Sequence, residues 1–167
     1  MTRPTSTESV YVIDTNILIG FDIWHPFKNC PDFWVKLESA IKDGKVILLD
    51  VVVDEVRPYN LGLTKWLKKQ KDNGLIIKIS DEVREEAVRI DNQYKMINQN
   101  TGNSIADTYV IAFALLNGVG IFTRESPRKY SNQLYKIPDV CDKFGIAYKR
   151  SPAEIMSFIG INSINYT

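Results

Sequence analysis

Short apolar runs that alternate with helical segments constrain the fold of this chain more than any other feature. These runs occupy residues 10–13, 46–49, 75–79 and 119–122, and each has the length of a strand rather than of a helix. An uninterrupted run such as 10–13 is typical of a parallel strand that is covered on both faces. Helical segments between such strands indicate βαβ units. We therefore predict an α/β fold, a three-layer α/β/α sandwich around a central, mostly parallel sheet.

Local signals predict where the helices lie. Apolar residues at helical spacing indicate helices at 33–41 and 63–67, and Ser80 can cap the helix that follows it. The pattern at residues 151–154 is typical of a capping box that opens a last helix. Further helices are expected around Glu55, over 104–117 and from Pro138, with an edge strand at 146–148.

The length of the chain is compatible with a single domain. Its 167 residues, 44% of them hydrophobic, can fill one core. We expect residues 1–9 to be a flexible N-terminal lead and residues 10–167 to form the domain. The sequence has no apolar stretch of the signal-peptide or membrane-spanning type, so we expect a cytoplasmic protein without membrane contact.

Four acidic residues lie where this architecture places the carboxyl ends of its strands. Asp14 follows directly on the first apolar run, and Glu125 follows the last one. Parallel strands end at the same edge of a sheet, and ligands bind at that edge in open α/β folds. Asp107 opens the helix that leads into the last run, and Glu55 lies in the first turns of the helix that leaves the second run. We expect all four carboxylates near one crevice.

A cluster of carboxylates at this edge would require cations to balance its negative charge. Crowded acids repel one another and raise one another's pKa, so the cluster is costly unless a cation neutralises it. Mg²⁺ and Mn²⁺ prefer oxygen ligands, whereas zinc and copper favour His and Cys. This chain has only one His and two Cys. We expect one or two Mg²⁺ or Mn²⁺ ions. Such ions activate water and stabilise the leaving oxygen of a phosphodiester, which points to nucleic-acid hydrolysis.

The chain resembles the PIN-domain nucleases in four stretches that contain these acids. The stretches are residues 12–16, 53–56, 106–112 and 123–125. They follow the order of that family's signature, which is an Asp at a strand end, a Glu in a helix, an Asp at a helix start and an acid after a strand. The last stretch departs from the commonest pattern, because Glu125 stands where that pattern has Asp.

This resemblance implies a metal-dependent endoribonuclease that acts on single-stranded or looped RNA. Residues 31–34 and 136–141 also resemble VapC-type toxins of prokaryotic toxin–antitoxin systems and their relatives. That similarity implies a toxin that an antitoxin protein blocks. A homodimer is implied only by analogy.

The resemblance and the strand-end placement together suggest a role for each acid. We expect Asp14 and Asp107 to hold the principal ion. Glu55 would help to hold the ion or orient its water. Glu125 would support a second ion or an outer water.

The two aspartates also have purely structural interpretations. Asp14 is a residue type that favours the N-cap position, and it could cap the turn that starts at Thr15. Asp107 stands three residues after Ser104, which is the spacing of a capping box. The order of the four acids counts against these interpretations without excluding them.

The two glutamates also have interpretations that involve no catalysis or metal binding. Glu55 could be a solvated helix-surface residue, with neighbouring Asp54 or Asp50 in its predicted role. Glu125 could pair with an arginine on a loop, either Arg124 or Arg128, in a surface contact of about 0–1 kcal/mol.

Polar and basic neighbours of the acids are candidates for substrate binding. Asn16 and Thr123 could hydrogen-bond a metal-bound water or a phosphate oxygen without adding charge, although roles in stabilising turns are equally compatible with the sequence. Arg124, Arg128 and Lys129 follow the fourth acid and could steer an RNA backbone. Because the net charge of the chain is only +1, contact with RNA must come from such a local patch.

Two further classes of function remain open. A phosphatase of the haloacid-dehalogenase type would use Asp14 as its nucleophile, but it requires a second Asp where this chain has Asn16. An RNA- or protein-binding module without activity would keep the fold, with metal affinity weakened at Glu125. We assign no chemistry to His25, which lies in an aromatic segment, or to the two cysteines.

Overall fold

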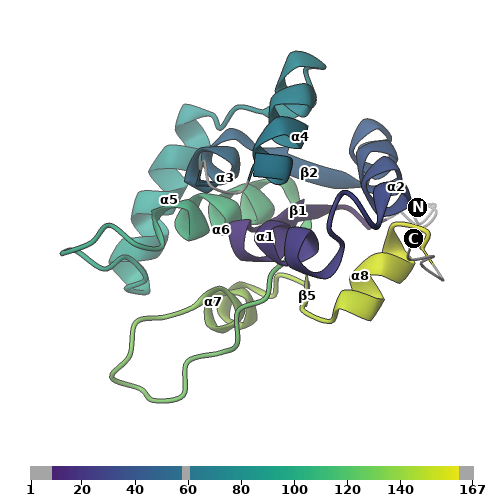
Figure 1. The fold of residues 1–167 in the computed structure, drawn as a ribbon. Helices are drawn as coiled ribbons and strands as arrows, with labels where there is room; N and C mark the ends of the chain where they lie inside the picture. Colours follow the sequence, from purple (N-terminus) through teal and green to yellow (C-terminus); the bar gives the residue numbers. More distant parts are fainter. Residues whose placement is uncertain (1–8, 58–60, 162–167) are drawn as a thin grey trace, which may run out of the picture.

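A parallel sheet forms the centre of the molecule. The computed structural model describes residues 9–57 and 61–161 (Figure 1). Five strands are hydrogen-bonded in the order β3-β2-β1-β4-β5, and all of their pairings are parallel. The strands are β1 (Tyr11–Ile13), β2 (Val46–Leu49), β3 (Ile76–Ile77), β4 (Gly120–Phe122) and β5 (Tyr148–Lys149).

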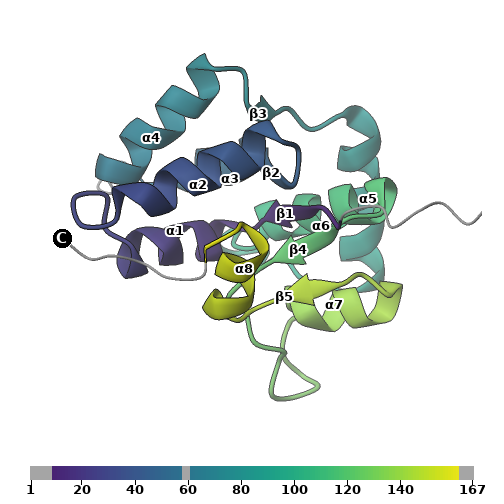
Figure 2. The same ribbon diagram turned by 90° about the vertical axis from the view of Figure 1, so that its right-hand side faces the viewer.

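Helices cover both faces of this sheet. They are α1 (Thr15–Trp24), α2 (Pro31–Lys42), α3 (Asp50–Glu55), α4 (Leu61–Asp72), α5 (Asp81–Gln93), α6 (Ile105–Asn117), α7 (Ile137–Phe144) and α8 (Pro152–Phe158). In Figure 2, α1, α2, α4 and α8 lie on one side of the sheet, and α5, α6 and α7 lie on the other. The predicted three-layer α/β/α fold is therefore confirmed.

Helix α1 was not predicted from the sequence. The predicted element at this place was only a turn at Thr15, whereas the structure has ten helical residues. Three apolar side chains of α1, Ile17, Leu18 and Phe21, are fully buried. Because the segment is almost uniformly apolar, it lacks the polar face by which a helical period is recognised. Asp14 at its start was the one available signal of a helix.

Smaller differences concern the edges of the sheet and one helix cap. Strand β3 is limited to Ile76–Ile77 within the predicted 75–79, and β5 begins at Tyr148 instead of 146. Helix α8 does start after Ser151, but the Ser151 side chain makes no capping hydrogen bond, so the predicted capping box is wrong. Edge strands pair on one side only, which explains why their ends are the hardest to predict.

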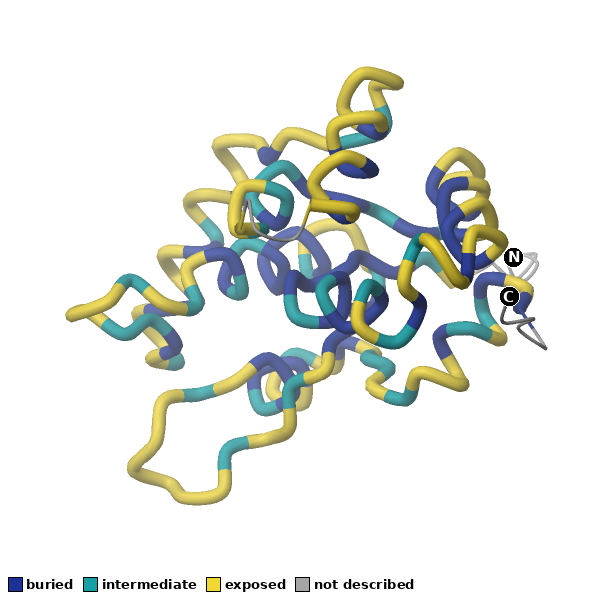
Figure 3. Tube along the Cα trace, in the orientation of Figure 1, coloured by how far each residue is buried: buried dark blue, intermediate teal, exposed yellow. Residues whose placement is uncertain are grey.

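Burial is concentrated in the strands and the helix faces that touch them. Figure 3 shows the central strands as buried and the long connection from β4 to α7 as mostly exposed. The first eight residues of the predicted lead 1–9, and residues 162–167 of the predicted domain, lie outside the described residues. None of the helices in the described part of the chain is long and apolar enough to cross a membrane.

Candidate functional site

Asp14 is held in place at the carboxyl end of β1. Its backbone N–H donates to the carbonyl of Phe122 on the neighbouring strand β4 (2.9 Å). The side chain is 1% exposed. One carboxylate oxygen accepts the N–H of Thr15 at 2.7 Å, and the other accepts the hydroxyl of Thr123 at 2.9 Å. Asp14 is thus the N-cap of α1, as its structural interpretation predicted, and it also faces the end of β4.

Glu125 is linked to Asp14 through the buried hydroxyl of Thr123. This hydroxyl donates to Asp14 and accepts the backbone N–H of Glu125 at 3.1 Å. The carboxylate of Glu125 accepts the N–H of Ile137, at the start of α7, at 2.9 Å. None of the ion pairs within residues 9–57 and 61–161 involves Glu125, so the alternative pairing with an arginine is wrong.

Asp107 lies in the first turn of α6, which covers the face of the sheet opposite to α1. The residue before this helix, Ser104, has a φ of 72° and makes no capping hydrogen bond with its side chain. The capping-box interpretation of Ser104 and Asp107 is therefore wrong. A negative charge in the first turn is favourable because unpaired N–H groups carry partial positive charge there. The Asp107 side chain is instead hydrogen-bonded to the side chains of Ser104 and Asp14, and the charges of Glu125 and Glu55 also act on it.

Glu55 completes the group from the end of α3. It is the last residue of this six-residue helix. Its carboxylate is exposed and accepts the hydroxyl of Thr15 at 2.6 Å. Thr15 was not among the predicted site residues, although its place after Asp14 at a strand end was a usable signal. Neighbouring Asp54 is also exposed and takes no part in this contact.

Asp50, the other alternative to Glu55, has a structural role instead. Its carboxylate accepts the N–H of Val51 at 2.8 Å and the N–H of Ile79, beyond β3, at 3.3 Å. These bonds tie the start of α3 to the chain that leaves the edge strand. Glu55 is therefore the acid of this helix that lies at the site.

The electrostatics show that these acids share one environment. Burial, followed by the charges of Asp107 and Glu125, raises the pKa of Asp14 well above 3.8, although hydrogen bonds from Thr123 and Thr15 oppose the rise. Burial, followed by the charge of Glu125 and more weakly that of Glu55, raises the pKa of Asp107 to about 7. Burial likewise raises the pKa of Glu125. Asp14, Asp107 and Glu125 are therefore each costly to ionise unless positive charge is supplied.

The donor set can be compared with what a divalent cation requires. Among the described residues, no group of three or more His, Cys, Asp or Glu side chains is arranged to hold a metal ion. Mg²⁺, however, is usually bound by one or two carboxylates and keeps several waters. The interacting pair Asp14 and Asp107 supplies that number of ligands and offers only oxygen donors. The pair therefore fits Mg²⁺ or Mn²⁺ rather than zinc.

A hydrogen bond between Asn16 and Arg124 connects the stretches 12–16 and 123–125. The side-chain oxygen of Asn16 accepts the backbone N–H of Arg124 at 2.8 Å. The guanidinium of Arg124 lies over the ring of Trp24, 5.0 Å from its centroid. A Cβ atom at Gly20 would lie 2.7 Å from the side chain of Arg124, so a larger residue would displace it. The structure thus gives Asn16 a positioning contact and leaves the side chain of Arg124 on the surface.

Arg128 points into its own loop. Its guanidinium donates to the carbonyls of Ser131 and Gln133, at 3.1 and 3.0 Å, and lies 3.6 Å from the centroid of the Tyr135 ring. This geometry serves the shape of the loop. The predicted contact between Arg128 and a phosphate stays a prediction.

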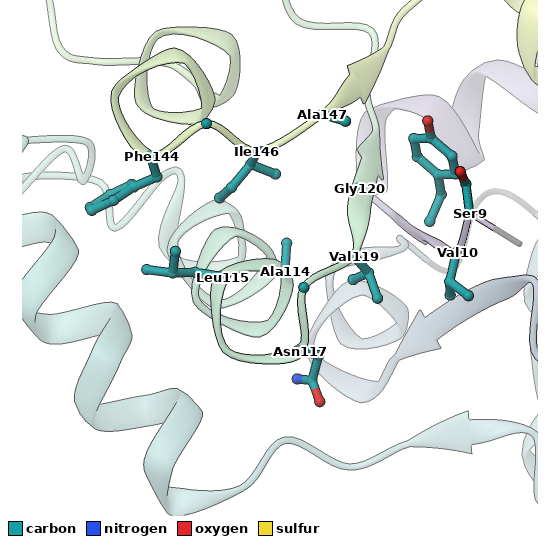
Figure 4. Close-up of a pocket in the computed structure, with 13 residues that line it drawn as sticks. Ser9, Val10, Ala114, Leu115, Asn117, Val119, Gly120, Phe144, Ile146 and Ala147 are labelled. Carbon is teal, nitrogen blue, oxygen red and sulfur yellow. The ribbon is translucent and has the colours of Figure 1, made fainter. Parts of the chain in front are cut away.

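A cavity of about 580 Å³ lies away from the acids. It is formed at the amino ends of β1 and β4, between the carboxyl ends of α6 and α7 (Figure 4). Val10, Gly120, Phe144 and Ala147 are among its lining residues, and none of the predicted site residues is. Ligand sites of open parallel sheets lie at the carboxyl ends of the strands, so the acids occupy the expected edge and this cavity the opposite one.

Comparisons with known proteins place the chain in a family. A family described as "Domain of unknown function (DUF4411)" matches residues 11–158. None of the curated proteins compared matches the chain. Four chains of solved structures match. One of them belongs to a "Toxin-antitoxin complex from Klebsiella pneumoniae"; it is 21% identical, the match covers 69% of this chain and 86% of that chain, and the TM-score is 0.44.

The family match coincides with the fold. It begins at Tyr11, the first residue of β1, and ends at Phe158, the last residue of α8. The matched segment therefore contains all five strands of the sheet and the four acids at its carboxyl edge. On this evidence the chain belongs to the DUF4411 family.

Proposed function

We propose that this chain is a metal-dependent endoribonuclease of the PIN-domain type, which hydrolyses RNA phosphodiester bonds. The observation that supports this most is the pairing of Asp14 and Asp107 at the carboxyl edge of a parallel sheet. Glu125 and Glu55 contribute charge to the same place. A buried acid pair of this kind is costly, and a divalent cation would offset the cost.

Asp14 and Asp107 would hold Mg²⁺ or Mn²⁺ in this proposal. When bound, the ion would supply water activation and charge stabilisation at the leaving oxygen. Thr123 fixes one oxygen of Asp14, and Thr15 fixes one oxygen of Glu55. We assign to Glu55, which is exposed, the orientation of the attacking water and acceptance of its proton.

Glu125 has an outer role in this proposal. One of its carboxylate oxygens accepts the N–H of Ile137, which leaves the other for a water or a second ion. A role as the toxin of a toxin–antitoxin pair, with an antitoxin partner, follows from the resemblance at residues 31–34 and 136–141, and a homodimeric state follows from analogy alone.

A binding module without nuclease activity is the second candidate. It is favoured by one observation, the lack of a group of three or more metal-ligating side chains within residues 9–57 and 61–161. Such a module would bind RNA or protein equally well with and without divalent ions. Dependence on ions therefore separates the two candidates.

The test is cleavage of a panel of single-stranded and hairpin RNAs by the purified chain. We expect cleavage with Mn²⁺ or Mg²⁺, none with EDTA, and none from Asp107→Asn. Asp54→Asn is the matched control, because Asp54 is an exposed acid beside Glu55 without a contact in the site, and it should cleave like wild type. Cleavage that persists in EDTA, or in Asp107→Asn at the wild-type rate, would contradict the proposal.

A further inference from the structure

We infer that the loop between β4 and α7, residues 124–136, is a preformed platform for single-stranded RNA, on which the ring of Tyr130 stacks against a base. This inference rests on the proposed function and adds the place where the substrate is held. The loop starts beside Asp14 and carries Glu125 in its second position. RNA bound to it would therefore extend from the acidic site.

The loop is held in one shape by its own polar groups. Arg128 donates to the carbonyls of Ser131 and Gln133 and covers the ring of Tyr135. The side-chain oxygen of Gln133 accepts the N–H groups of Lys129 and Tyr130, at 2.9 and 3.3 Å. These bonds close a compact turn whose tip is residues 129–133. A turn that is already ordered loses little further freedom when it binds a ligand.

The base of the loop is attached to the body of the protein. One carboxylate oxygen of Asp139, in α7, accepts the N–H groups of Arg128 and Lys136 at 3.0 and 2.9 Å. The N–H of Tyr135 donates to the carbonyl of Lys95, beyond α5, at 2.8 Å. The rings of Tyr94 and Tyr135 meet edge to face, with centroids 5.3 Å apart. The platform is therefore fixed relative to the acids.

The tip presents an aromatic ring to solvent. Tyr130 is 66% exposed. Within the described part of the chain its ring has no aromatic or cation–π partner, whereas its backbone N–H and carbonyl bond to Gln133. The backbone is thus fixed while the ring face is open. Aromatic rings on fixed backbone are the usual platforms on which unpaired bases stack.

The charge of the loop favours a nucleic acid as the partner. Residues 124–136 contain four basic residues but only one acidic residue, Glu125, although the net charge of the whole chain is +1. The basic residues are Arg124, Arg128, Lys129 and Lys136. Arg150 adds a further cation and donates to Ser126 at 2.7 Å. Positive charge around an exposed ring is the combination that binds single strands, because the cations contact phosphates and the ring contacts bases.

The test measures binding separately from cleavage. The parent is Asp107→Asn, which cannot cleave if the proposed function holds, and fluorescence anisotropy reports its affinity for labelled oligouridine and for an abasic ribose-phosphate strand of equal length. In this parent, Tyr130→Ala should weaken oligouridine binding by about 5- to 150-fold, the range of one lost stack. It should leave binding of the abasic strand unchanged, because that strand offers phosphates but no base.

Two variants make the result specific. Tyr130→Trp should retain tight oligouridine binding, because indole also stacks. Leu134→Ala is the matched control, since Leu134 is another exposed apolar residue of the loop, 42% exposed, and should bind like the parent. Circular dichroism melting of each variant shows that the fold is kept.

The outcomes separate this inference from the proposed function. If Tyr130→Ala binds oligouridine as tightly as the parent, the platform is wrong even when wild type cleaves RNA. The platform is also wrong if Tyr130→Ala weakens binding of the abasic strand as much as binding of oligouridine. Failure of the parent to bind oligouridine at all also overturns it. If wild type cleaves no RNA in any condition but binding depends on Tyr130, the platform stands and the nuclease proposal fails.

Discussion

At the scale of residues, Asp14 and Asp107 form a pair whose negative charges repel each other. Burial and the neighbouring charges raise the pKa of Asp14 well above 3.8 and the pKa of Asp107 to about 7. Without a cation the pair relieves this repulsion by binding a proton. A divalent cation would relieve it by displacing that proton, so metal affinity should rise with pH up to about pH 7.

The raised pKa of Asp107 predicts how stability depends on pH in EDTA. A carboxyl with a folded-state pKa of about 7 instead of 3.8 stabilises the fold most when it is protonated. This contribution is complete at pH values below the unfolded-state pKa and is lost as pH rises through about 7. Burial lowers the pKa of His25, which acts in the opposite direction below pH 7, so wild type must be compared with a variant.

Asp107→Asn is that variant, because it keeps His25 and removes one titrating acid. Between about pH 4 and pH 7 the unfolding free energy of wild type should decline relative to that of Asp107→Asn. Urea unfolding at several pH values measures both. Parallel pH profiles of the two proteins would show that Asp107 does not titrate in this range.

Thr15 provides a second prediction at this scale. Its hydroxyl donates to Glu55 at 2.6 Å and orients an otherwise exposed carboxylate. Thr15→Val keeps the shape but removes one hydrogen bond of about 1 kcal/mol, so the cleavage rate should fall by about 3- to 10-fold. Thr15→Ser keeps the hydroxyl and should restore the rate. Equal rates for Val and Ser would mean that the orientation of Glu55 is immaterial.

At the scale of elements, Asp50 is the side chain that joins α3 to the segment after β3. Asp50→Ala removes its bonds to the N–H groups of Val51 and Ile79. The free energy of unfolding should fall by about 1–3 kcal/mol. Asp54→Ala, in the same helix and exposed, should change it by about 0.5 kcal/mol or less. Urea unfolding measures both, and equal losses would contradict the assigned role of Asp50.

The elements also show how far sequence alone could reach. The strands were predictable because short apolar runs without polar alternation occur where strands are covered on both faces. Helix α1 was not, since Ile17, Leu18 and Phe21 face the core around a helix with almost no polar side. The inward turn of Arg128 depends on carbonyls of its own loop, which no pattern of residue types reveals.

At the scale of the whole molecule, the parallel topology brings the acids together. Asp14 and Glu125 follow neighbouring strands β1 and β4, and Asp107 begins the helix that leads into β4. This convergence could be predicted, because it depends only on strand direction. The hydrogen bonds that connect Thr15 with Glu55 and Thr123 with Asp14 could not, because they depend on side-chain rotamers.

The charge distribution of the molecule predicts the salt dependence of RNA binding. The net charge is +1 and the positive residues near the site are those of the loop 124–136 together with Arg150, so few phosphates can be contacted at once. For two to four phosphate contacts the slope of log K against log salt should be about −1.5 to −3. Anisotropy titrations of Asp107→Asn at several salt concentrations measure it. A slope steeper than about −5 would require a broad basic face.

The central claim, that Asp14 and Asp107 form a divalent-cation site, is tested most directly by Mn²⁺ titration followed by electron paramagnetic resonance at pH 7.5. Wild type and Asp54→Asn should bind Mn²⁺ alike, and Asp107→Asn should bind at least about 10-fold more weakly, because the loss of even an outer-shell partner of a metal costs about 10- to 100-fold in affinity. Equal Mn²⁺ binding by all three proteins, or binding by none, would contradict the claim.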